Sequence, residues 1–511
     1  DVSAEQDNSI LAWYTTNSNG SLKVYIGSEA EIFANQNSTD LFAYIGYATT
    51  CTSTETITNL NLLNVTGVTN MYRMFRSTGY RSMTKLDLGD TFDTSNAISM
   101  SAMFENTGYL AMTTLNLGEK FNTSKVTNMA YMFNNCGYTK LESLDLSNFN
   151  TSKVTNMAYM FQRVGYTAMT IINLGDNFDT SNATLMHNMF CQAGRQKLTT
   201  LNLGEKFNTA KVTNMSSMFN WMGALTKLDL GDKFDTSNVT NMNNMFWGTG
   251  ANAMTSFNLG DKFDTSKVTT MNSMFYDFGK KLETLDLGDK FYTTAVTDMT
   301  NMFYRAGDTS MTTIDLGPAF TKIADTHDNM FYNTGKSGAI KIQASEQIYL
   351  DKNNFKLNTD ATTSAINYTR GTINPKYRTE WIKEASAIDT TNKNITITLR
   401  GRTNAEAGVD FTSNVTSSLT ADKVHVYFDG EEVTNITKSL AAATTATNAT
   451  TGANDVLQVL TLSNLVENAR QSGKSFKEWS GNISLKIDKK TLKDDTYSNQ
   501  NLQAIDTSGT M

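Results

Sequence analysis

Residues that could carry out catalysis are few in this chain of 511 residues. It has only three histidines, His187, His327 and His425, and each lies in a different sequence context. Catalysis needs titratable groups that converge on one point, so solvated or packed histidines are the favoured interpretation. The sequence has no Ser elbow, HExxH motif, phosphate-cradling loop or dinucleotide fingerprint. We therefore expect a protein that is not an enzyme, with no catalytic residue and no cofactor.

Carboxylates are the only plentiful reactive groups, and some recur in a fixed place. They share a column with amides, one residue per repeat and each between two apolar residues: Asp87, Asn116, Asp145, Asn173, Asn202, Asp229, Asn258, Asp286 and Asp315. A glycosidase needs one acid and one differentiated base, which equivalent carboxylates do not supply. Calcium binding is a second interpretation, because calcium prefers clustered oxygens. A solvated polar face, in which the amides dilute charge repulsion, is the favoured one, and we expect no metal site.

Aromatic residues outside the apolar pattern form two four-membered stripes along the repeats. Tyrosine and tryptophan dominate interface hot spots, so the stripes suggest a stacking platform for a glycan or a protein. Stacking between neighbouring repeats, which would fill a groove, is the slightly favoured alternative. The candidate binding residues are Tyr80, Tyr109, Tyr138 and Tyr166 in the first stripe, and Trp247, Tyr276, Tyr304 and Tyr332 in the second.

Charge and cysteine content narrow the class of protein. The net charge of −7 argues against nucleic acid as a partner, because phosphates demand a basic surface. No run of about 18 apolar residues is present, so no membrane span is expected. The three cysteines, Cys51, Cys136 and Cys191, match no metal site or disulfide framework and are expected to be unpaired thiols. The chain opens at Asp1 without a signal peptide, which suggests a processed piece of a longer precursor.

A repeat of 27–29 residues organises more than half of the chain. The dipeptide Met-Phe occurs ten times in register, with its Phe at Phe75, Phe104, Phe133, Phe161, Phe190, Phe219, Phe246, Phe275, Phe303 and Phe331. A glycine stands four residues after each of these phenylalanines. One such unit cannot bury its own apolar face, so neighbouring units must stack into a solenoid.

Each unit is predicted to be a strand followed by a short helix. Leu228 and Leu230 share one face of a strand. Val239, Met242 and Met245–Phe246 have helical spacing, and Gly250 fits a left-handed residue that closes the helix. Flexible methionines would fill the core between units. The fold class expected is an α/β leucine-rich-repeat solenoid of about ten strand–helix coils; an all-β solenoid is the competing fold.

The repeat resembles a known bacterial family. The segment L-D-L-S-N-F-N-T-S-K-V-T-N-M-A-Y-M-F, residues 144–161, is similar to the repeat of BspA-like leucine-rich-repeat surface proteins. The resemblance covers about residues 55–340. It implies an extracellular, cell-surface-associated protein of the kind often implicated in adhesion to host or neighbouring cells.

The two ends of the chain lack the repeat. Residues 1–54 are expected to form an N-terminal cap over the exposed edge of the first coil, before a solenoid over 55–340. Residues 341–376 are expected to be a C-terminal cap and joint. Residues 377–511 contain alternating segments such as 395–399 and 424–428, separated by turn-rich stretches. This pattern resembles a bacterial immunoglobulin-like β-sandwich.

Two functions follow from this organisation. The first is a surface adhesin that presents its repeat surface to a protein or glycan on a host or neighbouring cell. The second is a passive structural spacer within a larger surface protein.

Overall fold

The computed structural model describes two compact units, residues 1–342 with 351–372 and residues 343–350 with 373–511. Within the first 348 residues it describes 10–18, 20–54, 57–317, 319–345 and 348. Further along it describes 370–377, 381–389, 391–392, 394–401, 421, 424–428, 431–447, 454–465, 483–487 and 500–502. Most of the expected joint, 341–376, lies outside these residues.

The first unit consists of short strands, and its only described helices are two single 3₁₀ turns, Leu60–Leu62 and Lys336–Gly338. The strands are β1 (Leu11–Thr16), β2 (Leu22–Gly27), β3 (Ile32–Phe33), β4 (Leu63–Asn64), β5 (Lys85–Asp87), β6 (Thr114–Asn116), β7 (Ser143–Asp145), β8 (Ile171–Asn173), β9 (Thr200–Leu201), β10 (Lys227–Leu228), β11 (Ser256–Phe257), β12 (Thr284–Asp286) and β13 (Thr313–Asp315). Two more strands, β14 (Ala339–Ser345) and β15 (Arg370–Tyr377), extend the sheet of β12 and β13.

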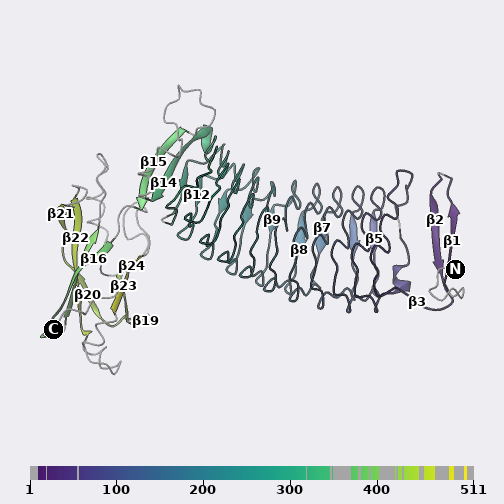
Figure 1. Ribbon diagram of the computed structural model, residues 1–511, viewed down its shortest axis with the longest axis horizontal. Coiled ribbons are helices and arrows are strands. Elements are labelled where there is room, and N and C mark those ends of the chain that lie inside the picture. The colour runs from purple at the N-terminus through teal and green to yellow at the C-terminus, as the bar shows by residue number, and fades with distance from the viewer. Residues whose placement is uncertain are drawn as a thin grey trace. The chain divides into compact units, whose positions relative to one another are not determined.

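The strands from β3 to β13 belong to a parallel β-solenoid of about eleven coils (Figure 1). Neighbouring strands pair in parallel, as Leu86 does with Leu115. On a second side of each coil, one residue per coil forms a parallel bridge to the next, in an unbroken series from Asn37 to Thr326. Each bridge joins one coil to the next, so the series of bridges runs along the axis of the solenoid.

The predicted helices are wrong, and the finding that overturns them is the hydrogen-bond pattern. In residues 128–135, the N–H groups of Met129, Tyr131, Phe133 and Asn135 donate to carbonyls of the next coil, at 2.8–3.0 Å. The intervening N–H groups bond within the coil, as Met132 does to the Met129 carbonyl at 3.2 Å. We call this segment, and its equivalent in each coil, the zigzag arm. It is an inter-coil ladder, so the fold is all-β.

Left-handed residues explain why the helical spacing was misleading. Tyr131 and Asn135 have φ values of 59° and 55°, which a continuous right-handed helix excludes. They stand four residues apart, so the outward-facing positions recur almost as they would in a helix. The same apolar spacing therefore serves either structure. Only the stacking of coils, which supplies carbonyl partners for alternate N–H groups, decides between them.

The core is a set of ladders in which each residue type stacks on its own kind. The repeat phenylalanines stack from Phe42 to Phe331 with ring centroids 5.1–5.9 Å apart. The methionines of the zigzag arm, such as Met129 and Met132, are fully buried beside them. The core role expected for the methionines is confirmed.

A column of buried threonines ties neighbouring coils together at another corner. The hydroxyl of Thr180 donates to the Asn208 carbonyl at 2.8 Å and accepts the Asn208 N–H at 2.7 Å. Thr94 makes the same pair of bonds with Asn122. Because these hydroxyls are 0 % exposed, they satisfy backbone groups that would otherwise be buried without partners.

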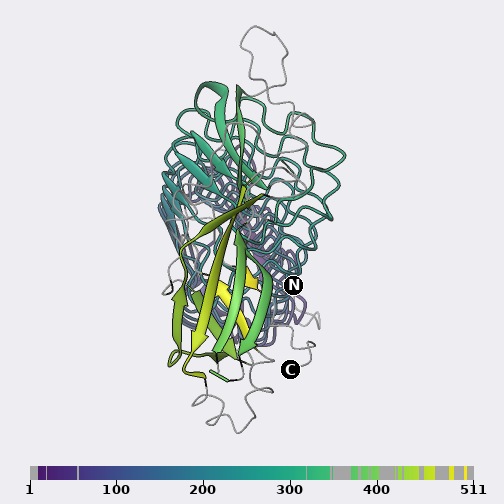
Figure 2. The same cartoon turned by 90° about the vertical axis from the view of Figure 1, so that its left-hand side faces the viewer.

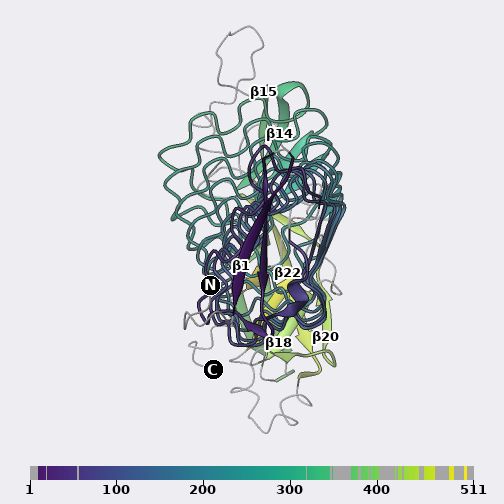
Figure 3. The same ribbon diagram turned by 90° about the vertical axis from the view of Figure 1, so that its right-hand side faces the viewer.

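The solenoid begins earlier than the sequence indicated, within residues 1–54. Phe42 stacks on Phe75 with centroids 5.2 Å apart, and Phe42 N–H donates to the Met74 carbonyl at 2.8 Å. In the later coils, the carbonyls at positions equivalent to Leu41 and Ala43 accept N–H groups from the preceding coil. Among the described residues, no donor reaches those two carbonyls. The antiparallel hairpin β1–β2 precedes this coil (Figure 3).

The second unit contains antiparallel strands. They are β16 (Trp381–Asp389), β17 (Asn394–Gly401), β18 (Val424–Phe428), β19 (Glu431–Glu432), β20 (Thr437–Leu440), β21 (Thr444–Thr447), β22 (Asn454–Ser463), β23 (Ile483–Ile487) and β24 (Gln500–Leu502). One sheet has the order β16-β17-β22-β20, with β21 also against β22, and the other has the order β19-β18-β23-β24. Figure 2 shows the strands of this unit in green to yellow.

The expected immunoglobulin-like sandwich is not evident in this second unit, as far as the structure describes it. The alternating segments do form strands, and residues 424–428 coincide with β18. Alternation specifies a strand with two different faces. It does not specify the order of strands or the packing of sheets, so the prediction went further than the pattern allowed.

Candidate functional site

The first predicted stripe is a stack of rings on the outside of the coils. Tyr80, Tyr109, Tyr138 and Tyr166 each follow the repeat glycine, which turns the chain out of the zigzag arm. Their ring centroids are 4.5–4.7 Å apart and their planes lie within 6–9° of parallel. Tyr47 extends the stack by one coil, at 4.9 Å from Tyr80.

The second predicted stripe is also stacked. Trp247 lies 4.8 Å from Tyr276, and the steps onward to Tyr304 and Tyr332 are 4.4 and 4.7 Å. The two tyrosine pairs are within 9° and 16° of parallel, whereas Trp247 is tilted by 46° from Tyr276. Coil-to-coil stacking, one of the two alternatives for these residues, is therefore what the structure shows.

Two side chains that the sequence did not single out join the stripes. Arg195 follows its repeat glycine, so it occupies the next rung after Tyr166, 5.5 Å from that ring centroid. On its other side it lies 4.3 Å from the ring centroid of Trp221, which is 6.5 Å from Trp247. The result is one series with a rung in every coil, here called the aromatic column: Tyr47, Tyr80, Tyr109, Tyr138, Tyr166, Arg195, Trp221, Trp247, Tyr276, Tyr304 and Tyr332.

The crossing between the stripes depends on a glycine. Trp221 stands two residues after its repeat Phe, between the positions of the two stripes. A Cβ built on Gly248, the equivalent residue of the next coil, would lie 2.6 Å from two ring atoms of Trp221. Gly248 therefore leaves the space in which the indole ring lies. The arrangement has a signal in the sequence, because this position carries glycine only in that coil.

The column presents ring edges to solvent, while the ring faces are covered. All eight predicted binding residues are half-buried, and parallel stacking covers both faces of an interior ring such as Tyr109. The pKa of Tyr109 is raised, first by burial and then by the neighbouring phenols of Tyr138 and Tyr80. Burial and Tyr304 raise the pKa of Tyr276 in the same way. Tyr109 and Tyr276 therefore present neutral phenol hydroxyls.

A shorter ladder lies on the zigzag arms of three coils. Tyr131 and Tyr159 occupy left-handed positions and stack at 4.3 Å, and His187 meets the Tyr159 ring edge-on at 5.0 Å. Burial lowers the pKa of His187, and its Nδ1 has no hydrogen-bond partner. His187 is therefore a packed, neutral residue, which agrees with one of the two interpretations that the sequence favoured. Of the other histidines, His327 contacts the Ala324 carbonyl through Nδ1 at 2.8 Å.

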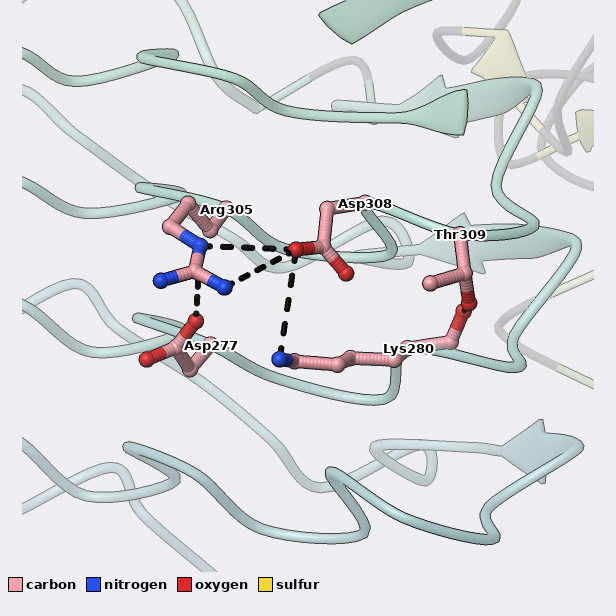
Figure 4. A network of polar contacts seen from close by, with 5 residues as sticks. All are labelled: Asp277, Lys280, Arg305, Asp308 and Thr309. Atoms are coloured by element: carbon pink, nitrogen blue, oxygen red, sulfur yellow. Dashed lines mark hydrogen bonds and ion pairs between the residues drawn. The ribbon is translucent and has the colours of Figure 1, made fainter. Parts of the chain in front are cut away.

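A charged network lies beside the second stripe (Figure 4). Arg305 Nε is 3.3 Å from Asp277 Oδ1, and its Nη2 is 3.3 Å from Asp308 Oδ2. Lys280 Nζ is 3.9 Å from the same Asp308 oxygen, and the Thr309 hydroxyl donates to the Lys280 carbonyl. Burial raises the pKa of Asp277, against the opposing effect of Arg305 and Lys280. The charges balance one another across two coils.

The Asp/Asn column has a structural role at the strand ends. Asp87 Oδ1 accepts the Gly89 N–H at 3.0 Å, and the equivalent bond recurs in every coil to the one from Asp315 Oδ1 to the Gly317 N–H. These are Asx turns, which favour Asp and Asn alike. Asn116 also donates to Asp87 across coils at 2.9 Å. In the described part of the chain, no three His, Cys, Asp or Glu side chains group as metal ligands.

The three cysteines are free thiols, as predicted. Cys136 is fully buried, and burial raises its pKa far above the ordinary value. Cys191 is 4 % exposed, and burial raises its pKa to about 11. Neither thiol is activated as a nucleophile, since activation requires a lowered pKa.

Taken together, stacked coils and an outward column define a parallel β-solenoid repeat protein with a repetitive surface. Residues 52–117, 69–200, 163–260 and 232–342 match the family model described as "Mycoplasma protein of unknown function, DUF285". These matches cover more than half of the 511 residues, and the chain belongs to this family. No curated protein and no solved structure matches it. No helix among the described residues is long and apolar enough to cross a membrane.

Proposed function

We propose that this chain is a non-enzymatic binding protein of a bacterial surface, which presents the aromatic column to a protein or glycan on a host or neighbouring cell. The observation that carries the proposal is the unbroken column, with one side chain in each coil. A series of phenol hydroxyls and indole edges, with the Arg195 guanidinium as one rung, suits an extended ligand that lies along the coil axis. The resemblance to BspA-like surface proteins supports an extracellular, cell-surface location.

The covered ring faces determine how such a ligand would be held. A stacking platform needs an exposed ring face, but neighbouring rings 4.4–4.8 Å away occupy the faces of the column. Recognition would therefore use hydrogen bonds to the phenol hydroxyls, with apolar contact limited to ring edges. Tyr276, Tyr304 and Tyr332 provide three adjacent hydroxyls of this kind.

A purified-chain screen against glycan arrays and whole cells tests the proposal. The informative variant replaces Tyr276, Tyr304 and Tyr332 together with Phe, which keeps the stacked rings and removes the hydroxyls. We expect an unchanged melting temperature and weaker binding to the partner that the screen identifies. The matched control is Tyr292→Phe, which removes a hydroxyl from an exposed ring outside the column and is expected to leave binding unchanged.

A passive spacer is the second candidate, because inter-coil stacking alone accounts for half-buried aromatic rings. It predicts that the wild-type chain binds nothing in either screen. It also predicts that replacing Tyr276 and Tyr304 together with Ala lowers the free energy of unfolding by about 3 kcal/mol or more. Wild-type binding that the triple Phe variant loses at unchanged stability would refute the spacer.

A further inference from the structure

One rung of the aromatic column is a guanidinium group. Arg195 lies between Tyr166 and Trp221, and its Nη1 donates to the Tyr166 hydroxyl. These neighbours hold the planar group in place without neutralising it. An arginine has five N–H donors in a fixed fork, so donors remain for a ligand.

A second arginine lies close to this rung. Arg163 is exposed, and its Nε donates to the neutral Gln192 Oε1 at 2.9 Å. The pKa of Tyr138 is raised by burial and by Tyr166, and the charge of Arg163 opposes that rise. Arg163 also stands three residues before Tyr166 in the same coil, and the equivalent pair, Arg305 and Asp308, is in contact at 3.3 Å. No carboxylate of the described residues forms an ion pair with Arg163 or Arg195.

Arg305 shows that the same position elsewhere has internal counter-ions. Arg163 and Arg305 each stand two residues after the repeat Phe and have left-handed backbones. Arg305 contacts Asp277 in the preceding coil and Asp308 in its own (Figure 4). At the equivalent positions around Arg163, the chain has Asn135 and Tyr166.

The lack of counter-ions at Arg163 and Arg195 indicates the charge of the ligand. A guanidinium fork matches the geometry of a carboxylate or a sulfate. Around the two arginines the surface has hydroxyls and amides, including Tyr138, Tyr166 and Gln192, which suit a ligand rich in hydroxyl groups. An added peptide strand would need free backbone N–H groups to pair with. The N–H groups of the zigzag arm already form hydrogen bonds between coils or within a coil, so the surface offers a peptide strand less to bind.

We propose that Arg163 and Arg195, with the hydroxyl edges of Tyr138 and Tyr166, bind the acidic group of an anionic glycan. The acidic group is a carboxylate or a sulfate, and the remaining sugar hydroxyls contact the neighbouring phenols and amides. This inference rests on the proposed binding function and specifies its ligand class.

The test measures binding of the whole chain to four polymers by calorimetry at fixed salt. Polygalacturonate supplies carboxylates, dextran sulfate supplies sulfates, neutral dextran has no charge, and poly-glutamate is the peptide alternative. We expect one or both acidic glycans to bind, with neutral dextran and poly-glutamate weaker. The stronger of the two acidic glycans identifies the acidic group.

Substitutions then locate the site. Arg163→Gln is expected to weaken acidic-glycan binding about tenfold, the effect of losing a charge-assisted contact. Arg163→Lys is expected to weaken it less, because it keeps the charge and loses the fork. Lys267→Gln is the matched control and should bind as wild type does. Among the described residues, Lys267 also pairs only with a neutral amide, Asn238 Oδ1 at 2.6 Å.

Several outcomes overturn the inference. Equal losses in Arg163→Gln and Lys267→Gln mean non-specific attraction, and preferred binding of poly-glutamate means a peptide ligand. Binding to neither acidic glycan, together with a partner found in the cell or array screen, refutes this ligand class and leaves the proposed function standing. Binding to nothing in any screen refutes both.

Discussion

Replacing Gly165 with Ala tests the geometry of the coil more directly than any other single change. Gly165 has a φ of +48°, and an added Cβ would lie 2.6 Å from the Met169 Cβ and 2.7 Å from the Leu141 carbonyl oxygen. The left-handed conformation costs about 1–2 kcal/mol with a side chain. The steric overlap adds about 1–3 kcal/mol, because one contact is with backbone of the preceding coil. The expected loss is therefore about 2–5 kcal/mol.

Gly231→Ala separates the two contributions. Gly231 has a φ of +75°, and an added Cβ would meet nothing within 4 Å, so only the conformational cost remains. Urea denaturation followed by tryptophan fluorescence gives both values, because Trp221 and Trp247 lie in the solenoid. If both variants lose the same free energy, the close approach of coils at Gly165 is wrong. A stable Gly165→Ala variant would refute the left-handed turn as well.

Three further changes probe the buried groups. Thr180→Val keeps the shape but leaves the Asn208 N–H and carbonyl without their partner; we expect a loss of about 2–4 kcal/mol in urea denaturation, and a loss below 1 kcal/mol would contradict the threonine ladder. The Cys191 thiol has an ordinary pKa of 9.0 in the unfolded chain and a pKa of about 11 in the folded chain. The free energy of unfolding should therefore fall by up to about 2–3 kcal/mol between pH 9 and 11. Cys191→Ala should remove that part of the fall. His187 has a lowered pKa, so the unfolded chain binds its proton first and stability should fall as the pH drops below about 6.5; an equal slope in His187→Gln would show that other groups cause it.

The period, the register and the buried residues could be predicted from the sequence. Met-Phe and the following glycine locate every coil from Phe75 onward, because stacked coils must repeat the same burial. The left-handed backbone after the repeat Phe was also predictable, and it holds for nine of the ten repeat glycines; Gly223 is the exception. The positive φ and the lack of room for a Cβ both require glycine at this position. The same residue therefore recurs in each repeat and can be recognised in the sequence.

The path of the chain between those points could not be predicted. Tyr131 and Asn135 adopt left-handed conformations without being glycines. For Tyr131 nothing local favours this, since the conformation costs about 1–2 kcal/mol. Asn135 is of a residue type that adopts it more readily, but this preference alone does not determine the path of the arm. The stabilisation comes from carbonyls in the next coil, which lie 28 or so residues away in sequence. A helix satisfies the same apolar spacing with local bonds, so local reasoning chose it.

The aromatic column was only partly visible for a related reason. Each stripe keeps a constant position in the repeat, so it could be recognised. The junction changes position from Arg195 to Trp221 to Trp247, and it includes a charged residue. Whether the side chains stay in contact through this junction depends on their positions in three dimensions. The position of a residue within the repeat does not give this. The same applies to Arg163, whose importance depends on the residues that surround it in two neighbouring coils.

The carbonyls of Leu41 and Ala43, at the start of the solenoid, give the zigzag arm a direction. Along this arm each coil donates N–H groups to the coil that follows it, and among the described residues no N–H reaches the Leu41 and Ala43 carbonyls of the first coil. Two copies of the chain that met through this arm, start to start, would oppose carbonyl to carbonyl. The start of the arm is therefore directional. A second copy in the start-to-start orientation has no N–H donors to offer these carbonyls, whereas a segment that presents N–H groups can pair with them.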